Sequence, residues 1–456
     1  MAESSAILNR QEYRDAALVA LVAIVVGAYR LTATSIDLDE AISVEYARVG
    51  IASLPRTILG GDPNMRFYFV LLSFWVKLFG EGETAVRSLS LLFAGLAAGM
   101  VCLLGTKLFG RAAGALAGAL FAIDPFVVQQ AHNARSYTLL TFLVSLSSLI
   151  LFAQRERSSE RARMAYVAVS VLAVYAHFFA ALVLLAHAAA CVILWRHEIL
   201  RGEWLRAAAA IVVLCIPLVI SSLQAGVGGI AWISAPTPRT IAIVVNALAG
   251  GNGFLTIVLL ACGAIALATA AHRRQSTAHL FVAIWLVLPI VVAYAVSLRH
   301  PVFERHYLII CLPPLLLLAA SVVASVGKIT GTAIAAILVA ALAFQLPAFH
   351  EREKGRDFRG ASKHVLRSAR PGDAIVFFPH YARRPYDYYA RRATGGFNPV
   401  LAPKDSMPRR TWLVIRQADA YRLPETLQGL RDSLGRHGRL EASRAFTSVG
   451  VDLYVR

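Results

Sequence analysis

Two neighbouring segments decide how this chain folds: the apolar run AALVALVAIVVGAY (Ala16–Tyr29) and the acidic stretch SIDLDEAIS (Ser35–Ser43). The apolar run predicts a membrane-spanning helix over residues 16–34. The acidic stretch then emerges at the membrane surface, in a chain whose formal net charge is +18. So many carboxylates in a basic membrane protein make this stretch the first candidate for a chemical role. Four acids precede the next cation in the sequence: Asp37, Asp39, Glu40 and Glu45.

The composition of the whole chain agrees with a membrane protein. Of the 456 residues, 57% are hydrophobic and 16% are charged, which is too apolar for a soluble protein of two domains. Much of the positive charge lies in short loops between apolar runs, where Lys and Arg fix the topology. This distribution excludes a nucleic-acid-binding surface. The five cysteines all lie in apolar segments and suggest neither disulfides nor a thiolate metal site.

The positive-inside rule predicts eleven spans and a cytoplasmic N-terminus. Arg10 and Arg14 precede the first span, so the acidic stretch emerges on the outer side. Two helices are then expected to lie on the membrane surface, over residues 39–60 and 64–80. A span at 64–80 would put every later basic loop on the wrong side. Further spans are expected at 86–106, 112–128 and 136–153, and the last at 330–347.

A change of composition after Pro347 predicts a second domain. Residues 350–456 are polar, and short β-rich runs at Ala374–Phe378 and Trp412–Ile415 accompany a helical stretch at 360–369. We therefore expect a membrane domain over 1–349 and a small extracytoplasmic α/β domain over 350–456. The latter contains neither a Gly-rich phosphate loop nor a nucleotide-binding fingerprint.

The acidic stretch has two interpretations. The pattern Asp37-x-x-Glu40 resembles a capping box, which would begin the surface helix at Asp37. Asp39 would then lie in the first turn, where the helix dipole stabilises a carboxylate, with Ser43 and Tyr46 on the same face. Such a carboxylate suits a general base that accepts a proton from a hydroxyl. The alternative is that these acids only cap the helix.

Several arginines on the predicted outer side oppose the positive-inside trend. Guanidinium groups bind phosphate through paired hydrogen bonds, so a cluster of them near the membrane surface would suit a lipid phosphate. Alternatively, each arginine simply extends toward lipid head groups. For Arg135 and Arg305, which lie near helix ends on the same side as Asp39, both interpretations stay open. The outer-side set is Arg66, Arg135, Arg239, Arg299 and Arg305.

Four histidines, His132, His177, His300 and His306, are also predicted on the outer side. None shows a two-histidine helical spacing with a carboxylate, so no metal site is predicted, and a bound divalent cation is the alternative. No other cofactor is expected. The aromatic helix 64–80 is either an interfacial belt or the wall of a lipid groove.

Several segments, taken in order, resemble the GT-C membrane glycosyltransferases of the protein O-mannosyltransferase and aminoarabinose-transferase type, a family-39-like group. The resemblance covers roughly residues 16–347 and rests on the order and spacing of the segments. They are Leu38-Asp39-Glu40-Ala41, Asn64–Phe69 with Trp75–Gly80, Ala134-Arg135-Ser136-Tyr137, Tyr175–Phe178, and Phe303–Tyr307 with Pro313-Pro314 beyond.

The resemblance implies an inverting transfer of a sugar from a polyprenyl-phosphate carrier to a glycan, lipid or protein acceptor on the outer face. The first-loop Asp39 is then the expected base, with Glu40 as its neighbour. Cations would stabilise the departing phosphate. The implied donor-binding residues are Arg66, Tyr68, Arg135, Tyr137, His177, Arg305, His306 and Tyr307.

The chain departs from the group's pattern at three places. Asn133 stands where an acid usually precedes Ala-Arg, and Met65-Arg66 stands where Pro-Pro is frequent. The group's later Arg-Tyr pair aligns with Arg305 or, by its spacing to the prolines, with His306. Arg305 is the preferred alignment.

The favoured hypothesis is therefore a glycosyltransferase of the plasma membrane. A transporter or flippase for a lipid-linked saccharide is the main alternative, and it predicts discontinuous helices and ionisable residues deep in the spans. A non-catalytic assembly protein is the third, and it predicts that Asp39 and Arg135 are dispensable.

Overall fold

The computed structural model describes residues 9–49, 64–155, 159–195, 202–225, 233–273, 277–352, 355–394, 396–402 and 408–456. The chain divides into two compact units. The first contains Met1–Arg30, Ala47–Gly80 and Ala85–Phe349, and the second contains Leu31–Tyr46, Glu81–Thr84 and His350–Arg456. The second unit thus includes two short segments that the sequence analysis assigns to the membrane domain.

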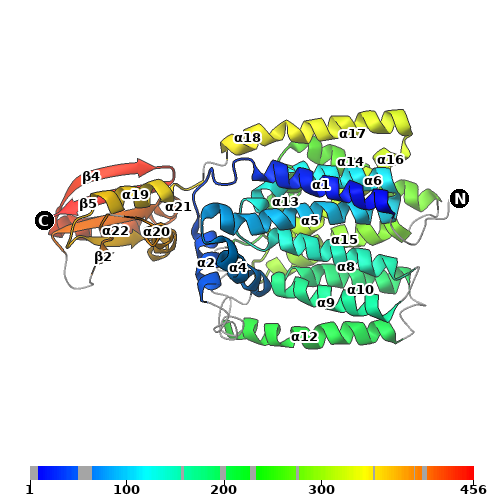
Figure 1. Cartoon of the computed structure of the whole chain (residues 1–456), viewed down its shortest axis with the longest axis horizontal. Coiled ribbons are helices and arrows are strands. Elements are labelled where there is room, and N and C mark those ends of the chain that lie inside the picture. The colour runs from blue at the N-terminus through cyan, green and yellow to red at the C-terminus, as the bar shows by residue number, and fades with distance from the viewer. Residues whose placement is uncertain are drawn as a thin grey trace. The chain divides into compact units, whose positions relative to one another are not determined.

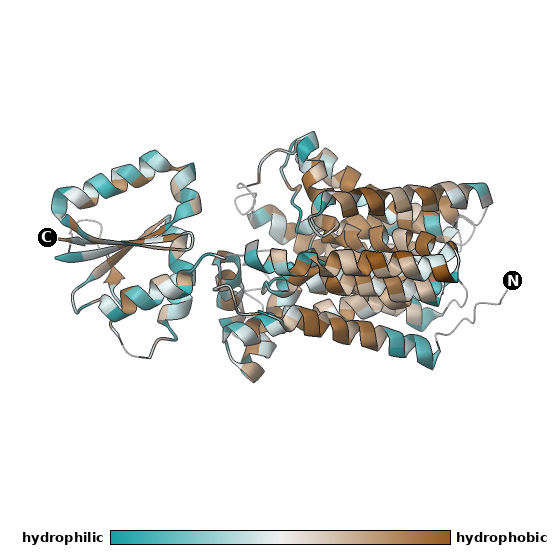
Figure 2. Ribbon diagram, turned by 90° about the horizontal axis from the view of Figure 1, so that it is seen from above, coloured by the Kyte–Doolittle hydropathy of each residue, from teal (hydrophilic) through white to brown (hydrophobic). Residues whose placement is uncertain are grey.

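The first unit is a bundle of helices that are apolar along most of their length (Figures 1 and 2). Helix α1 packs against α6, α8 against α9, α10 against α15, and α16 against both α6 and α14. The helices are α1 (Arg10–Ala28), α4 (Arg66–Phe79), α5 (Glu83–Phe109), α6 (Arg111–Ile123), α7 (Pro125–Ala131), α8 (Tyr137–Ala153), α9 (Glu160–Ala176), α10 (Ala180–Leu194), α12 (Glu203–Ala225), α13 (Pro238–Leu248), α14 (Gly253–Arg273), α15 (Thr277–Ser297), η3 (Tyr307–Cys311), α16 (Leu312–Ser325) and α17 (Lys328–Ala343).

Small residues allow α5 and α6 to approach closely. A Cβ atom added to Gly114 would collide with the Thr106 backbone and the Cys102 carbonyl of α5. Small side chains at helix contacts are typical of membrane bundles, where packing rather than exclusion of water drives association.

Within the described ranges, six helical segments are long and apolar enough to span a membrane, or seven with the bent pair α6–α7. They lie at Glu83–Phe109, Glu203–Gln224, Gly253–His272, Thr277–Ser297, Tyr307–Ser325 and Lys328–Glu351. The apolar helices α8 and α10 have only 17 and 15 residues. A polytopic helical membrane fold is therefore confirmed, while the count of eleven spans stays a prediction.

The first helix does not have its predicted bounds of 16–34. Helix α1 begins at Arg10 because Asn9 and Glu12 form a capping box. The Asn9 side chain accepts the Glu12 N–H at 3.0 Å, and the Glu12 carboxylate accepts the Asn9 N–H at 2.6 Å. These bonds satisfy amide groups that a helix N-terminus otherwise leaves unpaired. The helix ends at Ala28, earlier than predicted.

Two short helices correspond to the predicted surface helices. Helix α2 (Leu38–Arg48) begins one residue before the predicted 39–60, of which residues 50–60 fall outside the described ranges. Helix α4 matches the predicted 64–80. Their location at a membrane surface stays a prediction.

The span predicted at 112–128 is not one continuous helix. Helices α6 and α7 meet at Asp124 with a bend of 59°. The Asp124 carboxylate accepts the Phe126 N–H at 2.8 Å, and Pro125 begins α7. Proline has no amide hydrogen and disfavours helical backbone at the residue before it, so the break is encoded locally. One discontinuous helix is therefore present where a continuous one is predicted.

The C-terminal region of the second unit is a five-stranded mixed sheet in the order β2-β1-β3-β5-β4. Strand β1 pairs in parallel with β2 and β3, while β5 pairs antiparallel with β3 and β4. The elements are α18 (Gln345–Arg352), which begins within the first unit, α19 (Phe358–Ser368), β1 (Ala374–Phe378), η4 (His380–Ala382), α20 (Arg383–Ala390), β2 (Val400–Leu401), β3 (Arg410–Arg416), α21 (Gln417–Arg422), α22 (Pro424–His437), β4 (Arg439–Phe446) and β5 (Val449–Val455).

Alternating side chains of the strands build two apolar layers. Ile375 and Trp412 face α19 and α20, whereas Phe378 and Leu413 face α22. This period of two is what a sheet covered on both faces requires. The predicted small α/β domain is confirmed, including the strand at Ala374–Phe378.

Candidate functional site

Four of the predicted donor-binding residues meet in one cluster of rings within the helical unit. The Tyr137 ring lies 5.7 Å from His306, 5.8 Å from His177 and 6.3 Å from Tyr307, between centroids. The rings of His177 and Tyr307 are 4.8 Å apart. These residues come from the start of α8, the α9–α10 junction and the start of η3. We call Tyr137, His177, His306 and Tyr307 the ring cluster.

Polar side chains hold His306 within this cluster. Its Nδ1 atom hydrogen-bonds with the Gln130 side chain at 3.1 Å, and its ring stacks on Phe126. Its Nε2 atom lies 3.9 Å from a carboxylate oxygen of Glu304. Burial raises the pKa of the Glu304 carboxyl, so this acid keeps a proton to a higher pH than an exposed glutamate.

A second network joins Tyr68 to Arg135. The hydroxyls of Tyr68 and Ser90 hydrogen-bond at 2.8 Å, and Ser90 donates to the Arg135 carbonyl at 3.1 Å. The Thr138 hydroxyl donates to the Ser90 carbonyl at 2.8 Å. Arg135 is nearly buried and lies close enough to act electrostatically on His177. The network therefore fixes the backbone from which the Arg135 guanidinium extends, beside the ring cluster.

The start of α4 is tied to the same region. The Asn64 amide nitrogen lies 3.2 Å from His177 Nε2, and its oxygen accepts the Phe178 N–H at 3.2 Å. Arg66 is buried and donates to the Ser221 hydroxyl of α12 at 3.0 Å. Among the predicted outer-side cations, Arg66 and Arg135 have buried side chains.

Arg305 is not part of this arrangement. Its side chain is exposed, and its backbone N–H donates to the Glu304 carboxylate at 3.0 Å. Between the two residues aligned with the family's later pair, His306 and not Arg305 joins the ring cluster. Of the other predicted cations, Arg239 and Arg299 are exposed.

The acidic stretch belongs to the second unit. Asp37 precedes α2 as its N-cap residue, and the Glu40 carboxylate accepts the Asp37 N–H at 3.4 Å, which is half of the predicted capping box. Glu40 is buried, whereas Asp39 is exposed in the first turn. The Ser43 hydroxyl donates to the Asp39 carbonyl at 3.0 Å. Among the described residues, no hydrogen bond or ion pair engages the Asp39 carboxylate, so it is accessible to a hydroxyl.

Asp37 is engaged by the C-terminal region. Its carboxylate pairs with Arg356, and the charge of Arg416 acts on it as well. Burial nevertheless raises the pKa of the Asp37 carboxyl above its usual range, against the opposing effect of Arg356. Asp37 therefore has a structural role, and of the two aspartates Asp39 is the one whose carboxylate is accessible.

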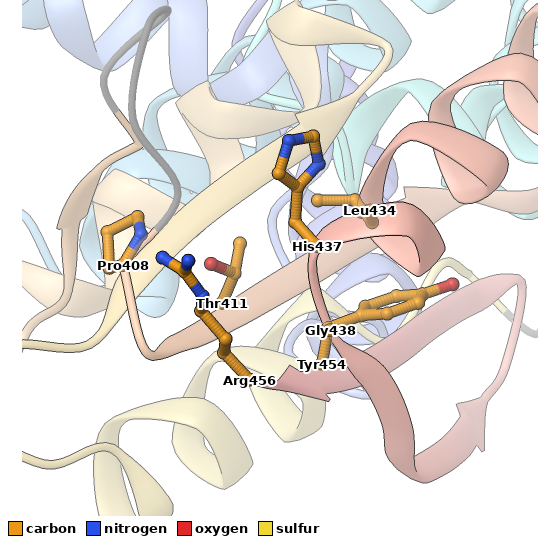
Figure 3. A pocket seen from close by; sticks show the side chains of 7 residues that line it. All are labelled: Pro408, Thr411, Leu434, His437, Gly438, Tyr454 and Arg456. Atoms are coloured by element: carbon orange, nitrogen blue, oxygen red, sulfur yellow. The ribbon is translucent and has the colours of Figure 1, made fainter.

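The remaining histidines do not extend the site. His132 hydrogen-bonds with the Gly27 carbonyl at 2.8 Å, and His300 is exposed. Within the described ranges, no three His, Cys, Asp or Glu side chains are grouped to hold a metal ion. A small pocket of the second unit, shown in Figure 3, contains none of the predicted site residues; its lining is Pro408, Thr411, Leu434, His437, Gly438, Tyr454 and Arg456.

Several residues that build this region were not predicted from the sequence. Ser90, Gln130 and Asn64 supply its hydrogen bonds, but isolated polar residues carry no signal of their partners. Arg87 of α5 is fully buried and was detectable, because a cation inside a predicted span is unusual.

Two comparisons bear on the fold and family. Residues 63–221 match the protein family described as dolichyl-phosphate-mannose-protein mannosyltransferase. This range includes Arg66, Arg135 and His177 but neither Asp39 nor His306. A search of curated proteins found none that matches this chain.

Solved structures resemble most of the chain. ArnT from Cupriavidus metallidurans bound to undecaprenyl phosphate has a TM-score of 0.60 at 14% identity, over 96% of this chain and 97% of that chain. The Archaeoglobus fulgidus oligosaccharyltransferase tethered to an acceptor peptide has a TM-score of 0.52 at 12% identity, over 83% of this chain and 63% of that chain. The archaeal AglB from the same organism, in complex with an inhibitory peptide and dolichol-phosphate, has a TM-score of 0.50. The chain therefore has the fold of the GT-C membrane glycosyltransferases, and its resemblance to their family-39-like group is confirmed.

Proposed function

We propose that this protein is an inverting glycosyltransferase that moves a sugar from a polyprenyl-phosphate carrier to a hydroxyl of a glycan, lipid or protein acceptor. One observation carries the proposal. Segments far apart in the sequence, each singled out by the family resemblance, converge: Asn64 bonds with His177, and the His177 ring packs against Tyr137 and Tyr307. Solved neighbours bind undecaprenyl phosphate or dolichol-phosphate, which supports a polyprenyl-phosphate donor.

In this proposal the buried arginines bind the donor phosphate. The Arg66 guanidinium is held by Ser221 and the Arg135 backbone by Ser90. A preorganised guanidinium stabilises a phosphate without reorganising during the reaction. The ring cluster and Tyr68 would line the donor site, where rings pack against a sugar or prenyl chain. The exposed Arg305 has a lesser role in this proposal.

Asp39 is the proposed base. It accepts the proton of the acceptor hydroxyl, and the oxygen attacks the anomeric carbon from the face opposite the phosphate. The bond between that carbon and the phosphate oxygen breaks with its electron pair, so polyprenyl phosphate leaves and the configuration inverts. The arginines compensate the charge that develops on the leaving phosphate. Glu40 is the less favoured base because it is buried.

The proposed location is the plasma membrane, with a cytoplasmic N-terminus and an extracytoplasmic C-terminal region. A multi-pass membrane protein follows from the apolar helices. The orientation rests on the distribution of basic loops.

The test is transfer from a synthetic polyprenyl-phosphate sugar in proteoliposomes. Asp39→Asn keeps the shape of the side chain but removes the base, and it should lower kcat about 10²–10⁴-fold. The control Glu40→Gln should retain far more activity. Near wild-type turnover by Asp39→Asn would refute the assignment of the base.

A transporter of lipid-linked saccharides is the second candidate, and the break at Asp124 favours it. A discontinuous helix with a buried acid is what that class predicts. Asp124→Asn preserves the N-cap acceptor, so it should leave sugar transfer unchanged. If the protein instead moves the lipid-linked sugar between leaflets without transferring it, and Asp124→Asn stops this movement, the transporter function is correct.

A further inference from the structure

The C-terminal region forms hydrogen bonds and close backbone contacts with the segment that leads into α2. The Ser35 hydroxyl donates to the Arg356 carbonyl and accepts the Phe358 N–H at 3.0 Å. A Cβ atom on Gly355 would lie 2.7 Å from the Thr34 Cβ atom, so the two backbones are in close contact. All of these residues lie in the second unit. Residues 32–37, which we call the entry segment, are therefore fixed immediately before the helix that carries Asp39.

Tyr389 of α20 bridges the entry segment to Glu83. Its hydroxyl accepts the Ile36 N–H at 2.7 Å and donates to the Glu83 carboxylate at 2.7 Å. One hydroxyl thus satisfies a backbone donor of the entry segment and a carboxylate at the start of α5. Tyr389 is half-buried, and buried polar groups are costly when a partner is lost.

Two arginines also bind the entry segment. Arg359 donates to Glu83 at 2.9 Å and to the carbonyls of Thr32 at 2.8 Å and Thr34 at 3.1 Å. Arg356 pairs with Asp37, the N-cap residue of α2. Further along α2, Glu45 pairs with Arg384 of α20 at 3.0 Å. Both the entry and the body of α2 are therefore bonded to the C-terminal region.

A catalytic base requires this kind of support. Ordering the backbone of a loop costs about 1–2 kcal/mol per residue, which local contacts must offset. A base misplaced by about 1 Å can lose about 10²-fold in rate. The contacts of residues 32–37 and of Glu45 hold the chain on both sides of the first turn of α2, in which Asp39 lies.

We propose that Tyr389, Arg356 and Arg359 are positioning residues for sugar transfer. They hold the entry segment, and through it they fix the first turn of α2 and the Asp39 carboxylate. The C-terminal region is thus required for the chemical step. This inference rests on the proposed function, in which Asp39 is the base.

Tyr389→Phe is the sharpest test because it removes both hydrogen bonds and keeps the ring. Its matched control is Tyr386→Phe on the same helix, whose hydroxyl donates to Asn398 at 3.2 Å and to no residue of the entry segment. In proteoliposomes, Tyr389→Phe should lower kcat about tenfold with an unchanged KM for the donor. Tyr386→Phe should keep kcat within about twofold, and the two variants should have similar Tm values.

A double variant asks whether Tyr389 acts through Asp39. In an Asp39→Asn background, Tyr389→Phe should cause no further loss, because residues that act as a unit are not additive. A further tenfold loss would mean that Tyr389 acts independently and would overturn the proposal. Equal kcat values for Tyr389→Phe and Tyr386→Phe would overturn it as well.

Arg356 provides a second test that does not depend on the tyrosine variant folding. Arg356→Lys keeps the charge opposite Asp37 and should retain more of kcat than Arg356→Gln, at equal amounts of folded protein. Equal losses of kcat in Arg356→Lys and Arg356→Gln would contradict the proposal that Arg356 positions the entry segment through its ion pair. If Asp39→Asn alone abolishes transfer while the Tyr389 and Arg356 variants are fully active, the proposed function stands and only the positioning role fails. If Asp39→Asn is fully active, both fail.

Discussion

The ring cluster and the entry segment are held in place by different forces. In the cluster, Tyr137 is nearly buried and contacts three other rings. The entry segment is instead held by hydrogen bonds and by the Asp37–Arg356 ion pair, whose side chains are about one-third exposed. Moderate salt changes ring packing little, whereas it screens the attraction within partly exposed ion pairs.

This difference matches the different roles proposed for the two regions. A site for a lipid phosphate and its sugar gains from rigid walls and fixed cations, because preorganised groups need not rearrange during the reaction. A segment carrying a base can be supported by weaker contacts from another part of the chain. We therefore expect defects in the ring cluster to be larger and less dependent on salt than defects in the entry segment.

The largest expected effect is on the ring cluster itself. Tyr137→Ala removes a buried ring and should destabilise the helical unit by about 3–5 kcal/mol, in line with other aromatic truncations. Transfer activity should be lost with it. Thermal unfolding in detergent measures the loss of stability, which should be the same at low and at high salt. Tyr137→Phe is the control, since it keeps the ring and should lose much less stability than Tyr137→Ala.

The next effect concerns the cation beside the cluster. Arg135→Gln should raise the KM for the donor about 10–100-fold, because it removes a charge-assisted hydrogen bond worth about 1.5–3 kcal/mol. The KM of Arg135→Lys should lie between those of the wild type and Arg135→Gln, since an ammonium keeps the charge without the paired donors. Steady-state kinetics on the same donor series gives the values. Arg239 is exposed, so Arg239→Gln should leave the KM for the donor unchanged. A rise in KM equal to that of Arg135→Gln would mean a general effect of surface charge.

The sequence predicts the parts of this fold that local patterns encode. Apolar runs located the long helices, and the period of two located the strand at Ala374–Phe378. The capping pattern placed the start of α2 correctly. The bend at Asp124 was missed although Pro125 marks it, because a proline in a membrane helix is often tolerated.

The candidate site was less accessible to sequence reasoning. Ring packing between Tyr137 and His306 joins residues whose separation leaves no periodic signal, and only a family pattern singles them out. The grip of Tyr389 on Ile36 joins residues more distant still: the sequence separation is 353. The choice between Arg305 and His306 depended on backbone direction before η3, which composition does not encode.

A smaller effect is expected at Arg359 in the grip on the entry segment. Arg359→Gln removes its ion pair with Glu83 and should cost about 0–1 kcal/mol, because the guanidinium is partly exposed. Amide hydrogen exchange of residues 32–37 in the full-length protein should speed up accordingly. High salt should reproduce part of this change in the wild type. Arg367→Gln on the exposed face of the same helix is the control, and equal acceleration in both variants would contradict the grip.

The smallest effect is a pH dependence at Asp37. Partial burial outweighs the charge of Arg356 and raises the pKa of the Asp37 carboxyl in the folded protein above the ordinary value. The folded state therefore holds this proton over a range of pH in which the unfolded state has lost it. Stability must then fall as pH rises from the ordinary aspartate pKa through the raised one, and level off above it. Protection of β1 and β3 from hydrogen exchange, corrected for intrinsic rates, measures this slope in the full-length protein.

Asp37→Asn should flatten the slope attributable to this group, because an amide does not titrate. Glu441→Gln, which changes an exposed carboxyl on β4, should leave the slope intact. A slope of opposite sign, with stability rising through this range, would mean that the charge of Arg356 outweighs burial at Asp37. The ion pair would then strengthen the entry segment as pH rises, and the difference between the two regions would narrow toward neutral pH.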